Sequence, residues 1–153
     1  MNIKLAVALL ISSILYCDAA ILKGKVIKVS DGDTIRLLTS DKQQHRIRLA
    51  NIDAPESKQA YGNKSRENLA NYIAKQYVTV DYNEKDKYGR IVGVVYLQNK
   101  NINLLQVQDG YAWYYKHFSN ENKYQKAEEE ARKSKKGIWK DKNPIEPWNF
   151  RRK

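Results

Sequence analysis

The order of strand-like and helix-like segments most constrains how this 153-residue chain can fold. Five short segments alternate polar and apolar residues or are rich in β-branched residues, which predicts strands, and one amphipathic helical segment follows the third of them. The predicted strands are residues 20–29, 34–39, 45–49, 77–82 and 91–97, and the predicted helix is residues 61–75. An Asp31-Gly32 turn joins the first two strands in a hairpin, so the first three strands predict an antiparallel meander.

Two more helices follow the last predicted strand. Residues 101–109 stop at Gly110 and predict a short buried helix, whereas residues 119–136 stop at Gly137 and predict a longer, highly charged one. The acidic and basic residues of the second helix recur at helical spacing, which indicates a solvent-exposed face and not a site. Five antiparallel strands with this helix order predict an α+β fold, a five-stranded Greek-key β-barrel of the OB type with about three helices.

Residues 1–19 have the pattern of a secretory signal peptide, with Lys4 before a short apolar run and a small residue, Ala19, at the cleavage site. An uncleaved amino-terminal anchor is the alternative. Cleavage leaves residues 20–153, a length typical of one domain, and removes the only cysteine, Cys17. We therefore expect one secreted or periplasmic domain with a basic C-terminal tail and no thiol chemistry.

The net charge of +11 is spread along the chain and is not confined to one tail. A spread positive charge attracts a polyanion such as nucleic acid, or an anionic membrane surface. The alternative is that the charge merely keeps a secreted protein soluble. Charge alone therefore leaves the function open.

The stretch from Arg48 to Glu56 places a cation, a potential metal ligand and a potential base within nine residues. Alternation in residues 45–49 places Arg48 on the polar face of a strand. Pro55 removes a backbone donor and restricts the residue before it, so we expect the strand to end near Asp53 and to present Glu56 on a turn. Each of these residues also has a plain structural explanation, as a turn former, a loop cap or a surface ion pair.

Four motifs of the chain also show a family resemblance. They are Asp31-Gly32-Asp33-Thr34, Arg48 through Asp53-Ala54-Pro55-Glu56, Asp86-Lys87-Tyr88-Gly89-Arg90, and Gly137-Ile138-Trp139. In order and spacing they closely resemble the staphylococcal nuclease (thermonuclease) family, from about Lys23 to Trp139. The resemblance implies that Arg48, Glu56 and Arg90 are the catalytic side chains.

The resemblance also implies a calcium site at Asp33 and Asp53, with Ala54 offering its backbone carbonyl. The family more often has threonine at the position of Ala54, but a backbone ligand survives that change. Oxygen ligands suit Ca²⁺, whereas zinc prefers His or Cys, and the mature chain has only His45 and His117 and no Cys.

The expected chemistry follows from these groups. Planar guanidinium groups at Arg48 and Arg90 can each meet two phosphate oxygens as charge develops on them. Glu56 could accept the proton of the attacking water or only orient that water. Tyr88 is a candidate substrate contact, or else a turn aromatic packed on the barrel.

We therefore expect a monomeric, secreted, Ca²⁺-dependent endonuclease that hydrolyses DNA and RNA with little sequence preference. The resemblance implies 3′-phosphate products. A non-catalytic OB-fold module that binds nucleic acid is the main alternative, although such a module would be expected to lose these acids and arginines. A cationic membrane-active protein is a third alternative, and it would need no ordered metal site.

Overall fold

The computed structural model describes residues 19–153. The predicted signal peptide therefore lies outside the described residues, apart from its last position. Within this part of the chain, no helix is long and apolar enough to cross a membrane.

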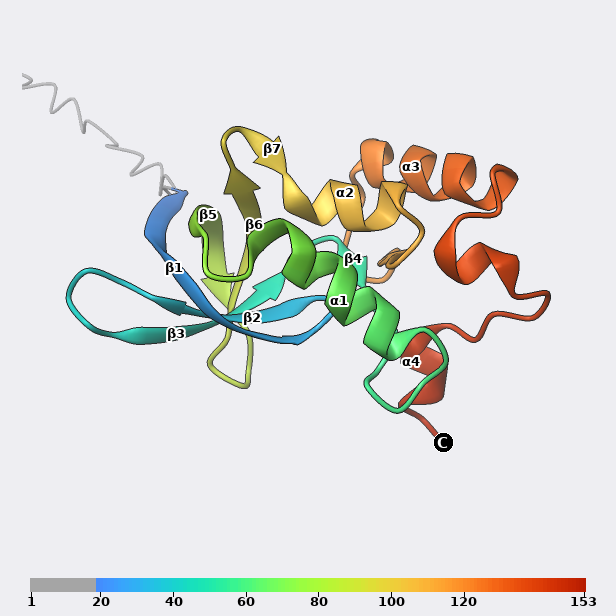
Figure 1. Cartoon of the computed structure of the whole chain (residues 1–153), viewed down its shortest axis with the longest axis horizontal. Coiled ribbons are helices and arrows are strands. Elements are labelled where there is room, and N and C mark those ends of the chain that lie inside the picture. Colours follow the sequence, from blue (N-terminus) through green and yellow to red (C-terminus); the bar gives the residue numbers. More distant parts are fainter. Residues whose placement is uncertain (1–18) are drawn as a thin grey trace, which may run out of the picture.

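Five strands form a closed β-barrel, as the sequence predicted (Figure 1). They are β1 (Ala20–Asp31), β2 (Thr34–Leu38), β3 (Gln44–Leu49), β5 (Tyr77–Lys85) and β6 (Ile91–Leu97). Neighbouring strands run antiparallel in the order β3-β2-β1-β5-β6, and a short strand, β7 (Lys100–Asn101), extends the edge beside β6. The prediction of five antiparallel strands was wrong in one respect, because the barrel closes through a parallel pairing of β3 with β6.

The chain between Leu49 and Asp53 differs from the prediction. Strand β3 ends at Leu49 and does not continue to Asp53, because Asn51 adopts a left-handed conformation with a φ of 69°. Asparagine tolerates that region better than most residues. The chain then forms a two-residue strand, β4 (Ile52–Asp53), which pairs with β8 (Trp113–Tyr114) and places Asp53 opposite Trp113. A second small sheet thus positions Asp53.

The helices cover one end of the barrel. They are α1 (Gly62–Ile73), α2 (Ile102–Gln108), α3 (Asn122–Lys133), the 3-10 helix η1 (Gly137–Lys140) and α4 (Pro147–Phe150). The first two match their predicted ranges closely, whereas α3 is shorter than residues 119–136. Figure 1 shows α3 far from the β2–β3 hairpin, with the chain then running back to α4 beside the loop before α1.

Two apolar clusters hold these layers together. The larger fills the barrel and the space under α1 and α2, and includes fully buried side chains such as Ile47, Leu69 and Val107. The smaller joins Trp113 to Trp139 and is flanked by Trp148. The tail therefore packs Trp139 and Trp148 against Trp113. Burial of this kind supplies most of the free energy of folding.

Two glycines fix the contact between the end of α2 and the start of η1. Gly110 and Gly137 have φ values of 79° and 51°, and a side chain at either would be strained. A Cβ atom on Gly110 would lie 2.3 Å from the carbonyl oxygen of Lys136, and one on Gly137 would lie 2.3 Å from the carbonyl oxygen of Gly110. The amide of Ile138 donates to that same Gly110 oxygen at 2.8 Å. Close backbone approach therefore explains both glycines.

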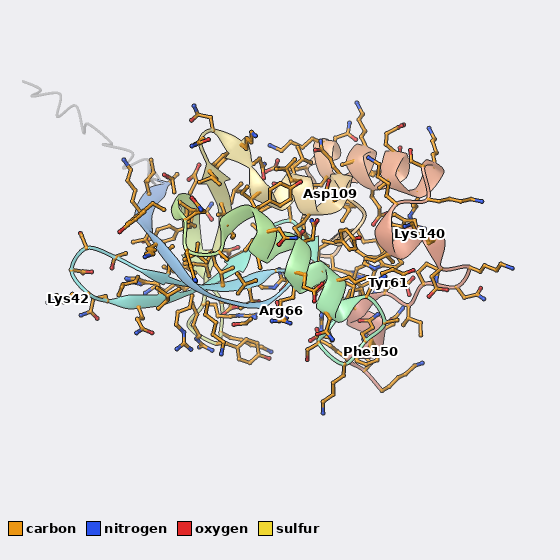
Figure 2. All side chains as sticks on the ribbon, in the orientation of Figure 1. Lys42, Tyr61, Arg66, Asp109, Lys140 and Phe150 are labelled. Atoms are coloured by element: carbon orange, nitrogen blue, oxygen red, sulfur yellow. The ribbon has the colours of Figure 1, made fainter. Side chains whose placement is uncertain are left out.

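Charged side chains extend from all sides of the described chain. Figure 2 shows Lys42 and Lys140 extending from opposite ends of the molecule. This distribution agrees with the spread of positive charge along the sequence.

Candidate active site

The turn between β1 and β2 presents Asp33 to the interior. Its Oδ2 accepts a hydrogen bond of 2.7 Å from the amide of Ala54, and its Oδ1 accepts one of 2.9 Å from the Thr34 hydroxyl. The amide of Asp33 donates to Oδ1 of Asp31 at 3.2 Å. These contacts tie the first hairpin to the strand end at Asp53-Ala54, so two segments far apart in sequence form one site.

Arg48 lies between the two predicted metal ligands. Its Nη2 is 3.2 Å from Oδ2 of Asp33 and 3.1 Å from Oδ1 of Asp53, while its Nη1 donates to the carbonyl oxygens of Leu49 at 2.7 Å and Ile52 at 2.9 Å. Only 12% of the Arg48 side chain is exposed, and the Asp53 side chain is fully buried. Arg48 is therefore not a mobile surface cation but a fixed group in a buried cluster, which we call the Asp33–Arg48–Asp53 cluster.

The surroundings of Asp33 favour its ionised form. Burial opposes ionisation, but the Arg48 guanidinium and hydrogen bonds from Asp31 and the Ala54 amide hold the pKa of Asp33 below its ordinary value. Opposite charge and hydrogen bonds to the carboxylate both stabilise the anion. Asp33 is therefore ionised at neutral pH.

Two neighbouring carboxyl groups behave in the opposite way. Burial, reinforced by the charge of Asp33, raises the pKa of Asp53 to about 6, although hydrogen bonds from Arg151 lower it. Burial and then the charge of Asp33 raise the pKa of Asp31 to about 7. Crowded carboxylates do not ionise independently. Asp31 and Asp53 are therefore harder to ionise than Asp33.

Glu56 lies on the turn after Pro55, as predicted, with 34% of its side chain exposed. Its amide donates to Oε1 of Gln59 at 3.1 Å, which orients the turn. Its Oε1 accepts a hydrogen bond of 2.8 Å from Nη1 of Arg151, a residue that also contacts Asp53. Glu56 therefore joins the cluster through a shared arginine.

Arg90 and Tyr88 lie on the turn between β5 and β6 and form a separate group. Oδ2 of Asp86 accepts a hydrogen bond of 2.7 Å from Nε of Arg90, and Oδ1 accepts bonds of 2.9 Å from the amides of Tyr88 and Arg90. The Arg90 guanidinium lies 5.5 Å from the centre of the Tyr88 ring, and Arg46 on β3 donates to the Tyr88 carbonyl. In residues 19–153 no side-chain hydrogen bond or ion pair joins this turn to the Asp33–Arg48–Asp53 cluster.

The chemistry of the cluster fits a hard divalent cation. The carboxylates of Asp33 and Asp53 both lie within 3.2 Å of Nη2 of Arg48, so the two carboxylates lie close to one another. Over the described part of the chain, no three or more His, Cys, Asp or Glu side chains form a ready-made metal cage. Two carboxylates leave the other positions to backbone and water oxygens, which is an arrangement that Ca²⁺ accepts.

Three residues of the site were not predicted from the sequence. Asp31 was considered only as a turn former, and Arg151 only as part of a basic end. Tyr115 was not considered, yet its ring centre lies 6.0 Å from the Arg48 guanidinium and its hydroxyl lies 3.4 Å from Nη2 of Arg151. No local pattern marks Arg151, because its position depends on how the tail packs.

Known proteins resemble this chain over most of its length. The family model described as "Staphylococcal nuclease homologue" matches residues 46–141. The protein named "Micrococcal nuclease" from Shigella flexneri is 42% identical over 158 aligned residues, which cover 96% of this chain and 88% of that protein. An "Uncharacterized endonuclease" of Haemophilus influenzae is 44% identical over 128 residues, covering 84% of this chain and 72% of that protein. "Protein ParB" of Escherichia coli is 39% identical over 142 residues, covering 86% and 80%.

The family model spans more than half of the chain, and the alignments include the segment that forms the Asp33–Arg48–Asp53 cluster. The barrel also has the predicted strand order. The chain therefore belongs to the staphylococcal nuclease family, and with it to the nucleases that hydrolyse phosphodiester bonds.

Proposed function

We propose that the protein is a Ca²⁺-dependent endonuclease that cleaves DNA and RNA with little sequence preference and leaves 3′-phosphate ends. The observation that most supports the proposal is the buried Asp33–Arg48–Asp53 cluster. Burying charged groups costs free energy unless they are paired, and an apolar barrel interior would fold without them. A buried, mutually paired cluster is therefore better explained by chemistry than by stability.

In this proposal Asp33 and Asp53 hold the cation, together with the backbone carbonyl of Ala54 and water. When bound, Ca²⁺ would polarise a phosphoryl oxygen of the substrate. Asp33 suits this role because its surroundings keep its pKa low. Asp53 has a pKa raised to about 6, so it also ionises around neutral pH.

Arg48 and Arg90 would contact the phosphate, and Glu56 would act on the attacking water. Arg48 is fixed by its carboxylate and carbonyl contacts, so it can meet the phosphate without the entropic cost of immobilising a long side chain. Arg90, oriented by Asp86, approaches from the β5–β6 turn as the second guanidinium. Glu56 is partly exposed on the rim, where it can accept a proton from an attacking water or orient that water.

We also propose that the protein works as a monomer outside the cytoplasm, in a periplasm or in the medium. The support for this location is the signal-like sequence of residues 1–19. The proposed substrates suit a strongly basic protein, because nucleic acids are polyanions.

A nuclease assay tests the proposed function. The purified protein is incubated with single-stranded DNA or with RNA, in Ca²⁺ or in excess chelator, and the product ends are mapped with a phosphatase. We expect cleavage of both substrates only with Ca²⁺, and 3′-phosphate ends. The variant Asp33→Asn should lose Ca²⁺ binding and activity, whereas the matched control Asp81→Asn, on the exposed face of β5, should keep both. Full activity in chelator would contradict the calcium requirement, and binding without cleavage would favour the non-catalytic module.

A further inference from the structure

The residue after α4 reaches into the proposed active site. Nη1 and Nη2 of Arg151 donate to the two carboxylate oxygens of Asp53 at 3.0 and 2.8 Å. The same Nη1 donates to Oε1 of Glu56 at 2.8 Å, and Nη2 lies 3.4 Å from the hydroxyl of Tyr115. One guanidinium thus engages both oxygens of a proposed metal ligand and one oxygen of the proposed base.

Aromatic packing holds the tail in this position. The ring of Trp148 stacks on that of Tyr115, with centres 5.6 Å apart and an angle of 12° between the planes, and it meets Trp113 edge-on at 5.7 Å. Aromatic pairs of this kind contribute free energy beyond the area they bury. Arg151 follows Trp148 within one helical turn, so the stacking and the guanidinium contacts support one another.

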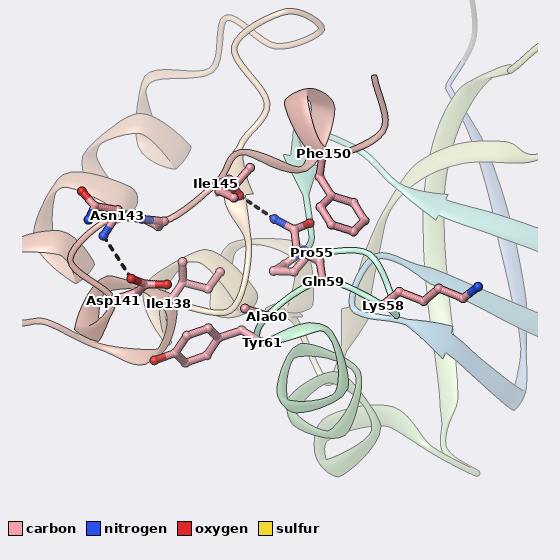
Figure 3. A pocket seen from close by; sticks show the side chains of 11 residues that line it. Pro55, Lys58, Gln59, Ala60, Tyr61, Ile138, Asp141, Asn143, Ile145 and Phe150 are labelled. Atoms are coloured by element: carbon pink, nitrogen blue, oxygen red, sulfur yellow. Dashed lines mark hydrogen bonds between the residues drawn. The ribbon is translucent and has the colours of Figure 1, made fainter. Parts of the chain in front are cut away.

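A second attachment lies on the loop before α1. Nε2 of Gln59 donates to the carbonyl oxygen of Ile145 at 2.6 Å. Figure 3 shows this bond, with Phe150 placed beside Pro55 at the edge of the pocket that they help to line. Two contacts therefore join the segment that carries Glu56 to the segment that carries Arg151.

These contacts conflict with a bound divalent cation. Asp53 already meets the Arg48 guanidinium on its Oδ1, and Arg151 takes up Oδ1 and Oδ2 together. A divalent cation on Asp53 would stand next to two guanidinium groups, and like charges at such short distances repel one another. The arginine and the cation require the same oxygen atoms.

We propose that Arg151 is a built-in competitor of the cation, so that the tail segment 145–151 closes the active site and must withdraw before Ca²⁺ and substrate bind. This proposal rests on the calcium site described under the proposed function. The Arg151 side chain is 39% exposed, and exposed ion pairs contribute little free energy. The competition is therefore reversible, and the tail lowers the apparent cation affinity by about tenfold without abolishing binding.

Calorimetric titration of Ca²⁺ into the full chain measures this competition without any activity assay. The variants are Arg151→Gln, which removes the bidentate contact, and Arg151→Lys, which keeps the charge but not the fork. The matched control is Arg152→Gln, because Arg152 is the exposed neighbour of Arg151. We expect the Kd for Ca²⁺ to fall about tenfold in Arg151→Gln, to fall less in Arg151→Lys, and to stay unchanged in Arg152→Gln.

Tryptophan fluorescence gives an independent measure of tail withdrawal. Ca²⁺ should change the emission of the wild type as Trp148 separates from Tyr115, and Trp148→Phe should remove most of that change. Thermal unfolding in chelator checks that every variant is folded. An equal or larger Kd in folded Arg151→Gln would overturn the competition while leaving the calcium site intact. Absence of Ca²⁺ binding in all the proteins would overturn both.

Discussion

Arg48 and Arg90 have the same predicted role, but the structure supports them in opposite ways. Arg48 is buried in the barrel wall and shared by two acids from different segments. Arg90 is more exposed and is oriented by Asp86, four residues earlier on the same turn. Arg48 therefore belongs to the framework of the protein as well as to the site, whereas Arg90 can change position without disturbing the core.

Replacing Arg48 should have the largest effect and should show both of its roles. Arg48→Gln leaves two buried carboxylates without their shared cation, so the free energy of unfolding at neutral pH should fall by about 3 kcal/mol. The kcat should fall by about a hundredfold to a thousandfold, since a fixed donor to the phosphate is lost. Urea unfolding in chelator and steady-state kinetics measure the two effects, and unchanged stability would contradict the framework role.

Arg90→Lys should separate activity from stability. Lysine keeps the charge but cannot meet two oxygens at once, so kcat should fall by about a hundredfold with a much smaller change in substrate binding. The free energy of unfolding should change by less than about 1 kcal/mol, because the ion pair with Asp86 is partly exposed. A folded variant with kcat within a few-fold of the wild type would show that Arg90 only binds substrate.

Asp86→Asn should have a smaller effect of the same kind. The amide oxygen can still accept the backbone hydrogen bonds from Tyr88 and Arg90, but the neutral side chain loses its ion pair with the guanidinium, so Arg90 becomes less well oriented. We expect kcat to fall by about tenfold, less than in Arg90→Lys. Combining the two changes in a double mutant cycle tests the assignment, and fully additive losses would mean that Asp86 acts independently of Arg90.

The two regions should also differ in the sign of their pH dependence. The pKa of Asp31 is raised from 3.8 to about 7, so its contribution to stability is fully present below pH 4 and is lost as pH rises to about 7. The pKa of Asp86 is lowered by hydrogen bonds from the Arg90 amide and side chain that outweigh burial. Ionised Asp86 therefore stabilises the fold above its ordinary pKa. This stabilisation is lost as pH falls through the lower pKa that Asp86 has in the folded protein.

Unfolding curves in chelator between pH 4 and 7 measure this difference. Relative to the wild type, Asp31→Asn should gain stability as pH rises, by about 1 to 2 kcal/mol over the range, because the neutral amide avoids a buried charge. Asp86→Asn should show no such gain. A flat difference curve for Asp31→Asn would mean that Asp31 keeps an ordinary pKa in the folded protein.

Local patterns predicted most of the fold and the Asp33–Arg48–Asp53 cluster. Alternation, the Asp-Gly turn and the amphipathic helix are properties of neighbouring residues, so the five strands and α1 were predicted within a few residues. The family motifs then identified Asp33, Arg48 and Asp53, and the structure brings these three side chains together.

The remaining features depend on contacts between distant segments. The parallel pairing of β3 with β6 closes the barrel, and no pattern within either strand specifies its partner. The end of β3 at Leu49 follows from one left-handed asparagine, Asn51. Arg151 meets Asp53 across 98 residues because Trp148 packs on Tyr115, which is a tertiary effect.

The contact between Gly110 and Gly137 has a consequence for the mutational tolerance of the chain. A Cβ atom on Gly110 would first meet the backbone of Lys136, and one on Gly137 would meet the backbone of Gly110 and Asp109, so replacing one glycine makes no room for replacing the other. In a library of single substitutions scored for folded protein, both positions should be strongly depleted. Gly89 also has a positive φ, of 75°, but a Cβ atom there would meet nothing within 4 Å, so asparagine should be accepted. Gly110 and Gly137 therefore do not tolerate substitution, because the backbone around them leaves no room for a side chain.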